Sequence, residues 1–160
     1  MIDSYNDSIR YSDKVIMHAV DIVMKKDVPA FVLYASDHGE NLNDYGDGNF
    51  GHGTKGFTKF EFEIPFIIFY NDAFKKNYSV ELAEIKKHIH QPLNQDYISH
   101  TFLSLADIKD PQLYSPQNDL SSPDFQLHKR MIIDENMNLY DFDALNLDKR
   151  KVRKNKNEKN

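Results

Sequence analysis

The chain has no cysteine, no apolar run long enough to span a bilayer and no internal repeat. Without cysteine it can form neither a disulfide framework nor a metal site built on thiolate ligands. The lack of a long apolar run and of a signal peptide predicts that this chain carries no membrane anchor of its own. Nucleic acid is not an expected partner, because the sequence has no nucleic-acid-binding motif and no basic patch interleaved with aromatic residues.

Charge is distributed unevenly along the chain. Over residues 148–160, seven lysines and arginines stand against Asp148 and Glu158, so this segment carries +5 and residues 1–147 carry −10 of the total of −5. Such a run predicts a basic disordered tail. The mean hydropathy of −0.65 and the length of 160 residues predict one domain, or part of one, with a modest core in residues 1–147.

Apolar residues recur at two different periods. Spacing by three and four predicts an amphipathic helix over residues 5–25, with His18 packed on its apolar stripe. Short continuous apolar runs predict buried strands over residues 30–35 and 64–70. Further helices are expected over 79–90 and 96–107, a loop over 109–127, and short strands over 130–133 and 138–141.

This order of elements is typical of an α/β fold. We expect a three-layer sandwich in which helices cover both faces of a mostly parallel sheet. Aromatic and acidic residues alternate over residues 60–63, which indicates the entry into the second of the two longer strands.

Asp37 and His38 stand where the strand over residues 30–35 ends. In an open α/β sheet, ligands bind outside the carboxyl ends of the strands, where side chains can converge on them. A carboxylate oxygen beside an imidazole nitrogen suits Zn²⁺ and is acceptable to Mn²⁺. Because a catalytic zinc usually has three protein ligands, this pair predicts part of a metal site.

A glycine-rich loop follows the pair and ends in Gly51-His52-Gly53. Asp37-His38-Gly39 alone could also be an ordinary turn. A loop this long and rich in glycine, however, is usually functional or disordered in a compact domain, which favours the metal site. Glu40 could orient His38, as carboxylates do for metal-bound imidazoles, or it could cap the loop and face water.

The sequence resembles a known family at several places. Residues 36–40 (SDHGE), followed by Gly51-His52-Gly53 and by residues 63–68, are similar to the carboxyl-terminal part of the catalytic domain of bacterial phosphoethanolamine transferases, in the alkaline phosphatase and sulfatase superfamily. Residues 5–13 resemble the YDNSIxYxD helix start of that family, with its second and third residues in swapped order. Residues 95–103 resemble a later helix, so the likeness covers roughly residues 5–142.

The resemblance implies roles for individual residues. Asp37 and His38 are implied to be two ligands of a divalent metal, most plausibly zinc, with manganese as the second choice. His52 matches a later histidine that contacts the phosphoryl group, the leaving group or a second metal, and it could protonate the departing oxygen. The family's nucleophile is a threonine near the start of the soluble domain, and no threonine of this chain (Thr54, Thr58, Thr101) stands in a matching context.

The resemblance also implies a function. We expect residues 1–147 to be the carboxyl-terminal portion of a sulfatase-like catalytic domain, incomplete at its amino terminus. The missing amino-terminal sequence would carry transmembrane helices and the nucleophile. The expected reaction is metal-dependent transfer of phosphoethanolamine from a phospholipid donor to lipid A or a related glycolipid acceptor, at the periplasmic face of the inner membrane, with no turnover by this chain alone. Two alternatives stay open: a sulfatase or phosphoglycerol transferase of the same superfamily, and a non-catalytic truncated remnant or binding module.

Overall fold

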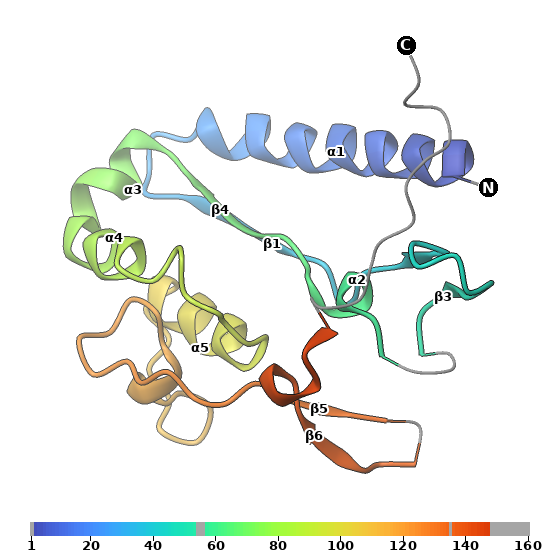
Figure 1. Ribbon diagram of the computed structural model, residues 1–160. Coiled ribbons are helices and arrows are strands. Elements are labelled where there is room, and N and C mark those ends of the chain that lie inside the picture. Colours follow the sequence, from blue (N-terminus) through green and yellow to red (C-terminus); the bar gives the residue numbers. More distant parts are fainter. Residues whose placement is uncertain (1, 54–56, 135, 148–160) are drawn as a thin grey trace.

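The computed structural model describes residues 2–53, 57–134 and 136–147, so the predicted tail over residues 148–160 lies outside the described residues. A long helix lies along a pair of strands, and shorter helices and further strand pairs follow (Figure 1). In chain order the elements are α1 (Ile2–Met24), β1 (Phe31–Ala35), β2 (Asn41–Leu42), β3 (Phe50–Gly51), α2 (Lys59–Phe62), β4 (Phe66–Tyr70), α3 (Asp72–Asn77), α4 (Ser79–Lys86), α5 (Asp96–Leu105), η1 (Pro116–Asn118), β5 (Met131–Ile133), β6 (Leu139–Asp141) and η2 (Asp143–Leu145).

The central strands β1 and β4 are antiparallel, with Phe31 opposite Tyr70 and Ala35 opposite Phe66. The described pairs β2–β3 and β5–β6 are antiparallel as well. The prediction of a mostly parallel sheet is therefore wrong for the strands that the structure describes. Parallel neighbours need a crossover that carries the chain back to the end where the first strand began. Here the chain passes through β2, β3 and α2 and enters β4 beside the end of β1, so β4 must run the opposite way.

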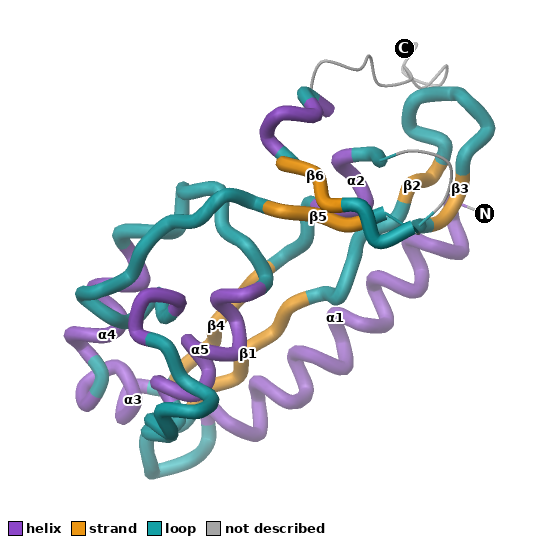
Figure 2. Tube along the Cα trace, turned by 90° about the horizontal axis from the view of Figure 1, so that it is seen from below, coloured by secondary structure: helices purple, strands orange, loops and turns teal. Residues whose placement is uncertain are grey.

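Helix α1 lies on one side of the β1–β4 pair, and α5 lies on the other (Figures 1 and 2). The helix predicted over residues 5–25 is thus confirmed. His18 is exposed, however, so the prediction that it packs is wrong. Ile16, Val20 and Val23 are the covered positions nearby, and each residue turns a helix by about 100°, so His18 projects roughly opposite to Ile16.

The hydrophobic core lies between the strands and α3, α4 and α5. Its buried centre is formed by Phe74, Leu82 and Leu105, one from each helix. Phe74 is 1% exposed, and its ring stacks on that of Tyr78 at a centroid distance of 4.3 Å. The partly buried hydrophobic residues that pack against this centre are Phe31, Ile68, Tyr70, Tyr78 and Ile85.

Asn71 fixes the turn from β4 into α3. Its Oδ1 caps α3 by accepting a hydrogen bond from the N–H of Phe74 at 2.8 Å, and it also accepts one from the N–H of Ala30 at 3.2 Å. Its Nδ2 donates to the carbonyl oxygens of Lys26 (3.0 Å) and Val28 (2.8 Å). One buried amide therefore ties the connection between α1 and β1 to the start of α3.

Residues 60–62 belong to helix α2, so the prediction that they lead into a strand is wrong. The backbone N–H of Glu61 donates to the carbonyl oxygen of Thr58, and the Oγ1 of Thr58 donates to the Oε1 of Glu61 at 2.9 Å. Thr-x-x-Glu is a spacing that starts helices. Burial of the Glu61 side chain against Thr58 overrides the two-residue alternation.

The carboxyl-terminal part packs through polar residues next to α5. Asp119 is fully buried and accepts hydrogen bonds from Tyr114 Oη (2.8 Å) and Ser121 Oγ (2.6 Å). Burial, and then the hydrogen bond to Asp119, raises the pKa of Tyr114 above its usual value, so this hydroxyl remains a donor. The short strands predicted over 130–133 and 138–141 are confirmed as β5 and β6.

Helix α1 has 23 residues but a mixed composition. Among the described residues, no helix combines the length and the apolar character needed to cross a bilayer.

Candidate active site

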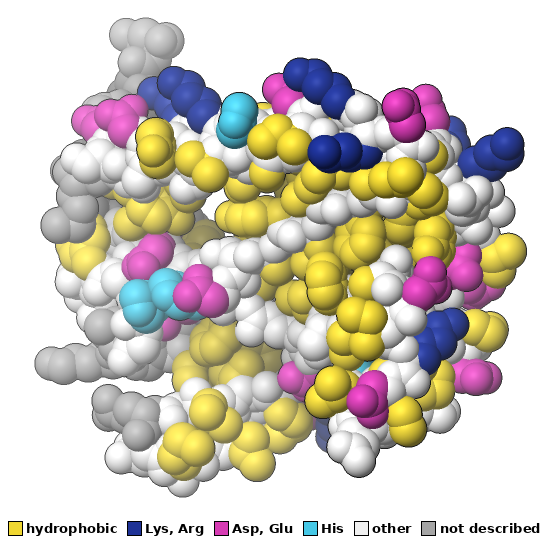
Figure 3. All heavy atoms as spheres, turned by 180° about the vertical axis from the view of Figure 1, so that it is seen from behind, with side chains coloured by type: hydrophobic (Ala, Val, Ile, Leu, Met, Phe, Trp, Pro, Cys, Tyr) yellow, Lys and Arg dark blue, Asp and Glu magenta, His cyan; other side chains and the backbone are white. Residues whose placement is uncertain are grey.

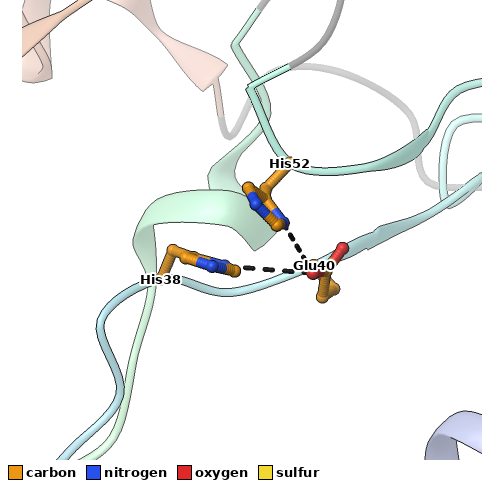
Figure 4. A group of neighbouring side chains, drawn as sticks. All are labelled: His38, Glu40 and His52. Atoms are coloured by element: carbon orange, nitrogen blue, oxygen red, sulfur yellow. Dashed lines mark hydrogen bonds and ion pairs between the residues drawn. The ribbon is translucent and has the colours of Figure 1, made fainter.

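His38, Glu40 and His52 meet just beyond the end of β1 (Figure 4). His38 and Glu40 follow the strand directly, whereas His52 comes from the far end of the glycine-rich loop. The pairing of β2 with β3 places Asn41 opposite Gly51, and this register brings Glu40 beside His52. The structure thus joins three residues that the sequence singled out separately.

The tautomer of His38 follows from its hydrogen bond. Its Nδ1 lies 2.9 Å from the carbonyl oxygen of Gly39, and because a carbonyl can only accept, Nδ1 carries the proton. The lone pair of Nε2 is then free to bind a metal, an arrangement common in metal-binding histidines. Nε2 lies 3.8 Å from the Oδ2 of Asp37, whose side chain is 88% exposed.

His52 is held by Glu40. Its Nδ1 lies 2.7 Å from the Oε1 of Glu40, so Nδ1 donates to this carboxylate and Nε2 carries the lone pair. The same Oε1 lies 3.9 Å from the Nδ1 of His38, and the two imidazole rings face each other with centroids 3.6 Å apart. Glu40 thus makes its shorter contact with His52 and a longer one with His38 (Figure 4), and its role in orienting His38 stays a prediction.

The strand exit is fixed by two residues that the sequence did not single out as site residues. The Nε2 of Gln95, just before α5, donates to the carbonyl oxygens of Ser36 (3.0 Å) and Asp37 (2.7 Å). The carbonyl oxygen of Glu61 accepts the N–H of Gly39 at 2.8 Å. Gln95 has no local signal, whereas Glu61 lies in the Thr-x-x-Glu pattern.

Gly39 lies so close to α2 that a Cβ at this position would be 2.0 Å from the carbonyl oxygen of Phe60. Gly39→Ala is therefore expected to push α2 away and to destabilise the chain by about 2 kcal/mol or more. Urea unfolding would give the free energy, and faster exchange of the amide hydrogen at position 39 would show that its bond to Glu61 is lost. As a control, Gly48→Ala has positive-φ strain but no contact within 4 Å, so it should leave that exchange rate unchanged.

A groove of about 1090 Å³ begins at Asp37 and His38. Its other lining includes Phe66 and Ile68 of β4 and Ile132 of β5, together with the cationic Arg130. Figure 3 shows histidine and acidic side chains at the edge of a broad hydrophobic area on this face of the molecule. The polar site therefore borders a mostly apolar groove.

The donor atoms at the strand exit fit a divalent metal. Zinc is bound by imidazole nitrogen and carboxylate oxygen at about 2.0–2.2 Å, so two ligands of one ion lie at most about 4.4 Å apart. The Asp37 Oδ2 to His38 Nε2 distance of 3.8 Å meets this limit. His38, Glu40 and His52 also offer ligand atoms within 4.8 Å of one another.

Two of the three threonines that do not match the family's nucleophile lie in described residues, and both form hydrogen bonds that stabilise the fold. Thr58 is buried and donates to Glu61, and Thr101 is buried and accepts the N–H of Leu120 at 3.0 Å. Thr54 lies outside the described residues. Both described hydroxyls therefore take part in buried hydrogen bonds, and that no threonine of this chain serves as nucleophile stays a prediction.

Comparisons with known proteins agree with the resemblance seen in the sequence. The chain is 31% identical over 122 residues to a phosphoethanolamine transferase, EptA, of Helicobacter pylori, which covers 75% of the chain and 22% of the relative. It is 33% identical over 91 residues to the Kdo(2)-lipid A phosphoethanolamine 7''-transferase of Escherichia coli, covering 54% of the chain and 15% of the relative. The chain thus spans about a fifth of the length of these curated relatives.

A solved structure shares the fold. The C-terminal periplasmic domain of EcEptC from Escherichia coli matches with a TM-score of 0.58 and 22% identity, over 71% of this chain and 32% of that one. This likeness supports the α/β class. The sulfatase family model matches residues 1–108. The resemblance to the catalytic domains of phosphoethanolamine transferases is therefore confirmed, and the chain belongs to the sulfatase family.

Proposed function

We propose that this chain is part of a metal-dependent enzyme that transfers phosphoethanolamine from a phospholipid to lipid A or a related glycoconjugate. Residues 1–147 would be the later portion of its sulfatase-like catalytic domain. The observation that carries the proposal is the pair Asp37 and His38, with a free Nε2 on His38 and a second oriented imidazole at 3.6 Å, in a chain whose named relatives are such transferases.

Phosphoryl transfer is catalysed mainly by positioning and by stabilising the charge on the transferring group. Asp37 Oδ2 and His38 Nε2 would hold a divalent metal, most plausibly Zn²⁺, which supplies Lewis-acid charge when bound. The hydrogen bond from His38 Nδ1 to Gly39 keeps the imidazole in the metal-binding tautomer.

His52 is the proposed proton carrier. Because its Nδ1–H is held by Glu40, its Nε2 can accept a proton or, once protonated, give one to the departing oxygen. In this proposal Glu40 positions His52 and does not bind the metal.

The remaining metal ligands and the nucleophile would come from sequence outside this chain. The chain by itself would then show no turnover. A complete enzyme whose donor and acceptor are both lipids would act at a membrane surface. We place it at the periplasmic face of the inner membrane, which the periplasmic location of the solved EcEptC domain supports. The apolar groove that begins at Asp37 and His38 would be covered in part by that further sequence.

Removing the metal should stop transfer. In the complete enzyme, transfer of phosphoethanolamine from phosphatidylethanolamine to lipid A can be measured as an increase in the mass of lipid A. Treatment with a chelator is expected to lower the rate by about a hundredfold or more, because a metal contributes several kcal/mol of charge stabilisation, and added Zn²⁺ should restore it. Full activity after verified loss of metal would contradict the proposal. Cleavage of a sulfate ester without transfer would instead favour the sulfatase alternative.

A further inference from the structure

We propose that Glu61 is the positioning residue that holds His52 against His38. Glu61 lies in the single turn of α2 and is only 6% exposed, although it is acidic. Its backbone contacts the segment that carries His38, and its side chain contacts the segment that carries His52. The effect of Glu61 on catalysis rests on the function proposed for His52, whereas its effect on the position of the His52 ring does not.

The backbone of Glu61 holds the segment that carries His38. Its carbonyl oxygen accepts the N–H of Gly39 at 2.8 Å. The approach is close, since a Cβ on Gly39 would overlap the carbonyl oxygen of Phe60. Helix α2 is therefore fixed relative to the exit of β1.

The side chain of Glu61 holds the segment that carries His52. Its Oε2 accepts the N–H of Gly53 at 3.2 Å, and its Oε1 accepts the Oγ1–H of the buried Thr58 at 2.9 Å. Gly53 has a φ of +63°, a conformation that glycine adopts without strain. The residue directly after His52 is thus bound to the same carboxylate that is locked into α2.

His52 needs such support because little else around it is buried. Its side chain is 52% exposed, and β2 and β3 have two residues each, too few to hold a loop by strand pairing alone. The imidazole nevertheless lies 2.7 Å from Glu40 and faces His38. The hydrogen bond from Gly53 to the buried carboxylate of Glu61, which Thr58 holds in turn, gives the loop a fixed point within one residue of the imidazole.

Replacing Glu61 by glutamine or by methionine distinguishes a positioning role from a role that needs the negative charge. In Glu61→Gln the amide oxygen can accept from Gly53, and the amide NH₂ can donate to Thr58, because a hydroxyl accepts as well as donates. In Glu61→Met the side chain has a similar length but makes neither bond. A positioning role predicts that Gln replaces Glu and that Met does not, whereas a metal ligand or a general base would be lost in both.

Nuclear magnetic resonance of the purified, metal-free chain tests the geometry. In the unaltered chain and in Glu61→Gln, ring protons of His38 and His52 should show cross-relaxation. In Glu61→Met, the ratio of docked to undocked His52 should fall by about fivefold, the effect of losing the one ordinary hydrogen bond that joins Glu61 to Gly53. Thr58→Val is the milder variant: it keeps the bond to Gly53 and removes only the bond that holds the Glu61 carboxylate, so its fall should be smaller than about fivefold. The control is Glu63→Met, the same change at an exposed position of the same segment, which should change nothing.

Kinetics of the complete enzyme test the consequence. Because only a docked His52 is placed to transfer the proton, Glu61→Met should lower kcat by up to about fivefold, the fall expected in the docked ratio, with little change in KM, and Glu61→Gln should restore most of it. Docked His52 in folded Glu61→Met, or equal damage by Gln and Met, would overturn the proposal. If Glu61→Met does not fold, a displaced His52 in Glu61→Gln, which can keep the bond to Gly53, would overturn it. If the complete enzyme does not transfer phosphoethanolamine, the proposed function is wrong, but the resonance test of how Glu61 positions His52 is unaffected.

Discussion

Replacing His38 by alanine is expected to remove the bound metal and to lower phosphoethanolamine transfer by about a hundredfold or more. The imidazole is one of the two proposed ligands of this chain, and loss of a Lewis acid worth several kcal/mol corresponds to a fall of this size. The measurements are the zinc content of the purified complete polypeptide and its initial rate of transfer. Asp37→Ala should have the same two effects, because its Oδ2 is the neighbouring donor atom at 3.8 Å.

Other histidines provide the controls for this prediction. His90→Ala removes an exposed imidazole beyond α4 and should change neither zinc content nor rate. His52→Ala should lower the rate but keep the zinc, because its proposed role is proton transfer. The opposite result is that His52→Ala loses zinc and Asp37→Ala retains it. It would show that His38, Glu40 and His52 bind the metal, and the proposed assignment of Asp37 as a ligand would be wrong.

Phe74→Ala is expected to destabilise the chain by about 3–5 kcal/mol, the range for truncating a buried phenylalanine. The side chain is 1% exposed and touches the rings of Phe31, Tyr70 and Tyr78, so alanine leaves a cavity between β1, β4 and α3. Domains of this size are stable by only about 5–15 kcal/mol, so the loss is a large part of the total. Urea unfolding followed by circular dichroism would measure it.

Phe50→Ala is the matched control, because it makes the same change at a side chain that is 42% exposed in β3. Its cost should stay below about 1 kcal/mol, as for most surface substitutions. Equal costs for the two variants would show that the helices α3, α4 and α5 do not form the principal core with β1 and β4.

Local periodicity was enough to predict the longer elements. The helix over residues 5–25 and the strand over 30–35 correspond to α1 and β1 because their apolar spacing matches one secondary structure and not the other. Helix α3 was not predicted, since six residues are too few to show a helical period. It forms because Asn71 caps it and Phe74 enters the core, and both depend on contacts with residues about forty positions away.

Strand direction could not be obtained in the same way. An apolar run predicts a strand, but it does not show whether that strand runs parallel or antiparallel to its neighbour. The return of the chain beside the end of β1 makes β4 antiparallel, and this depends on how the glycine-rich loop and α2 fold together.

The sequence by itself determined that Asp37 and His38 stand at a strand exit, that a second histidine follows in a glycine-rich loop, and that these motifs resemble one enzyme family. Motifs of this kind are local, and neighbouring residues must leave a strand together. Only the tertiary structure decided that Glu40 binds His52 and that the buried Glu61 joins the loop to the strand exit. These contacts cross eight to twenty-two positions of the chain, and their partners are set by folding, because donor and acceptor lie on segments that only the folded chain brings together.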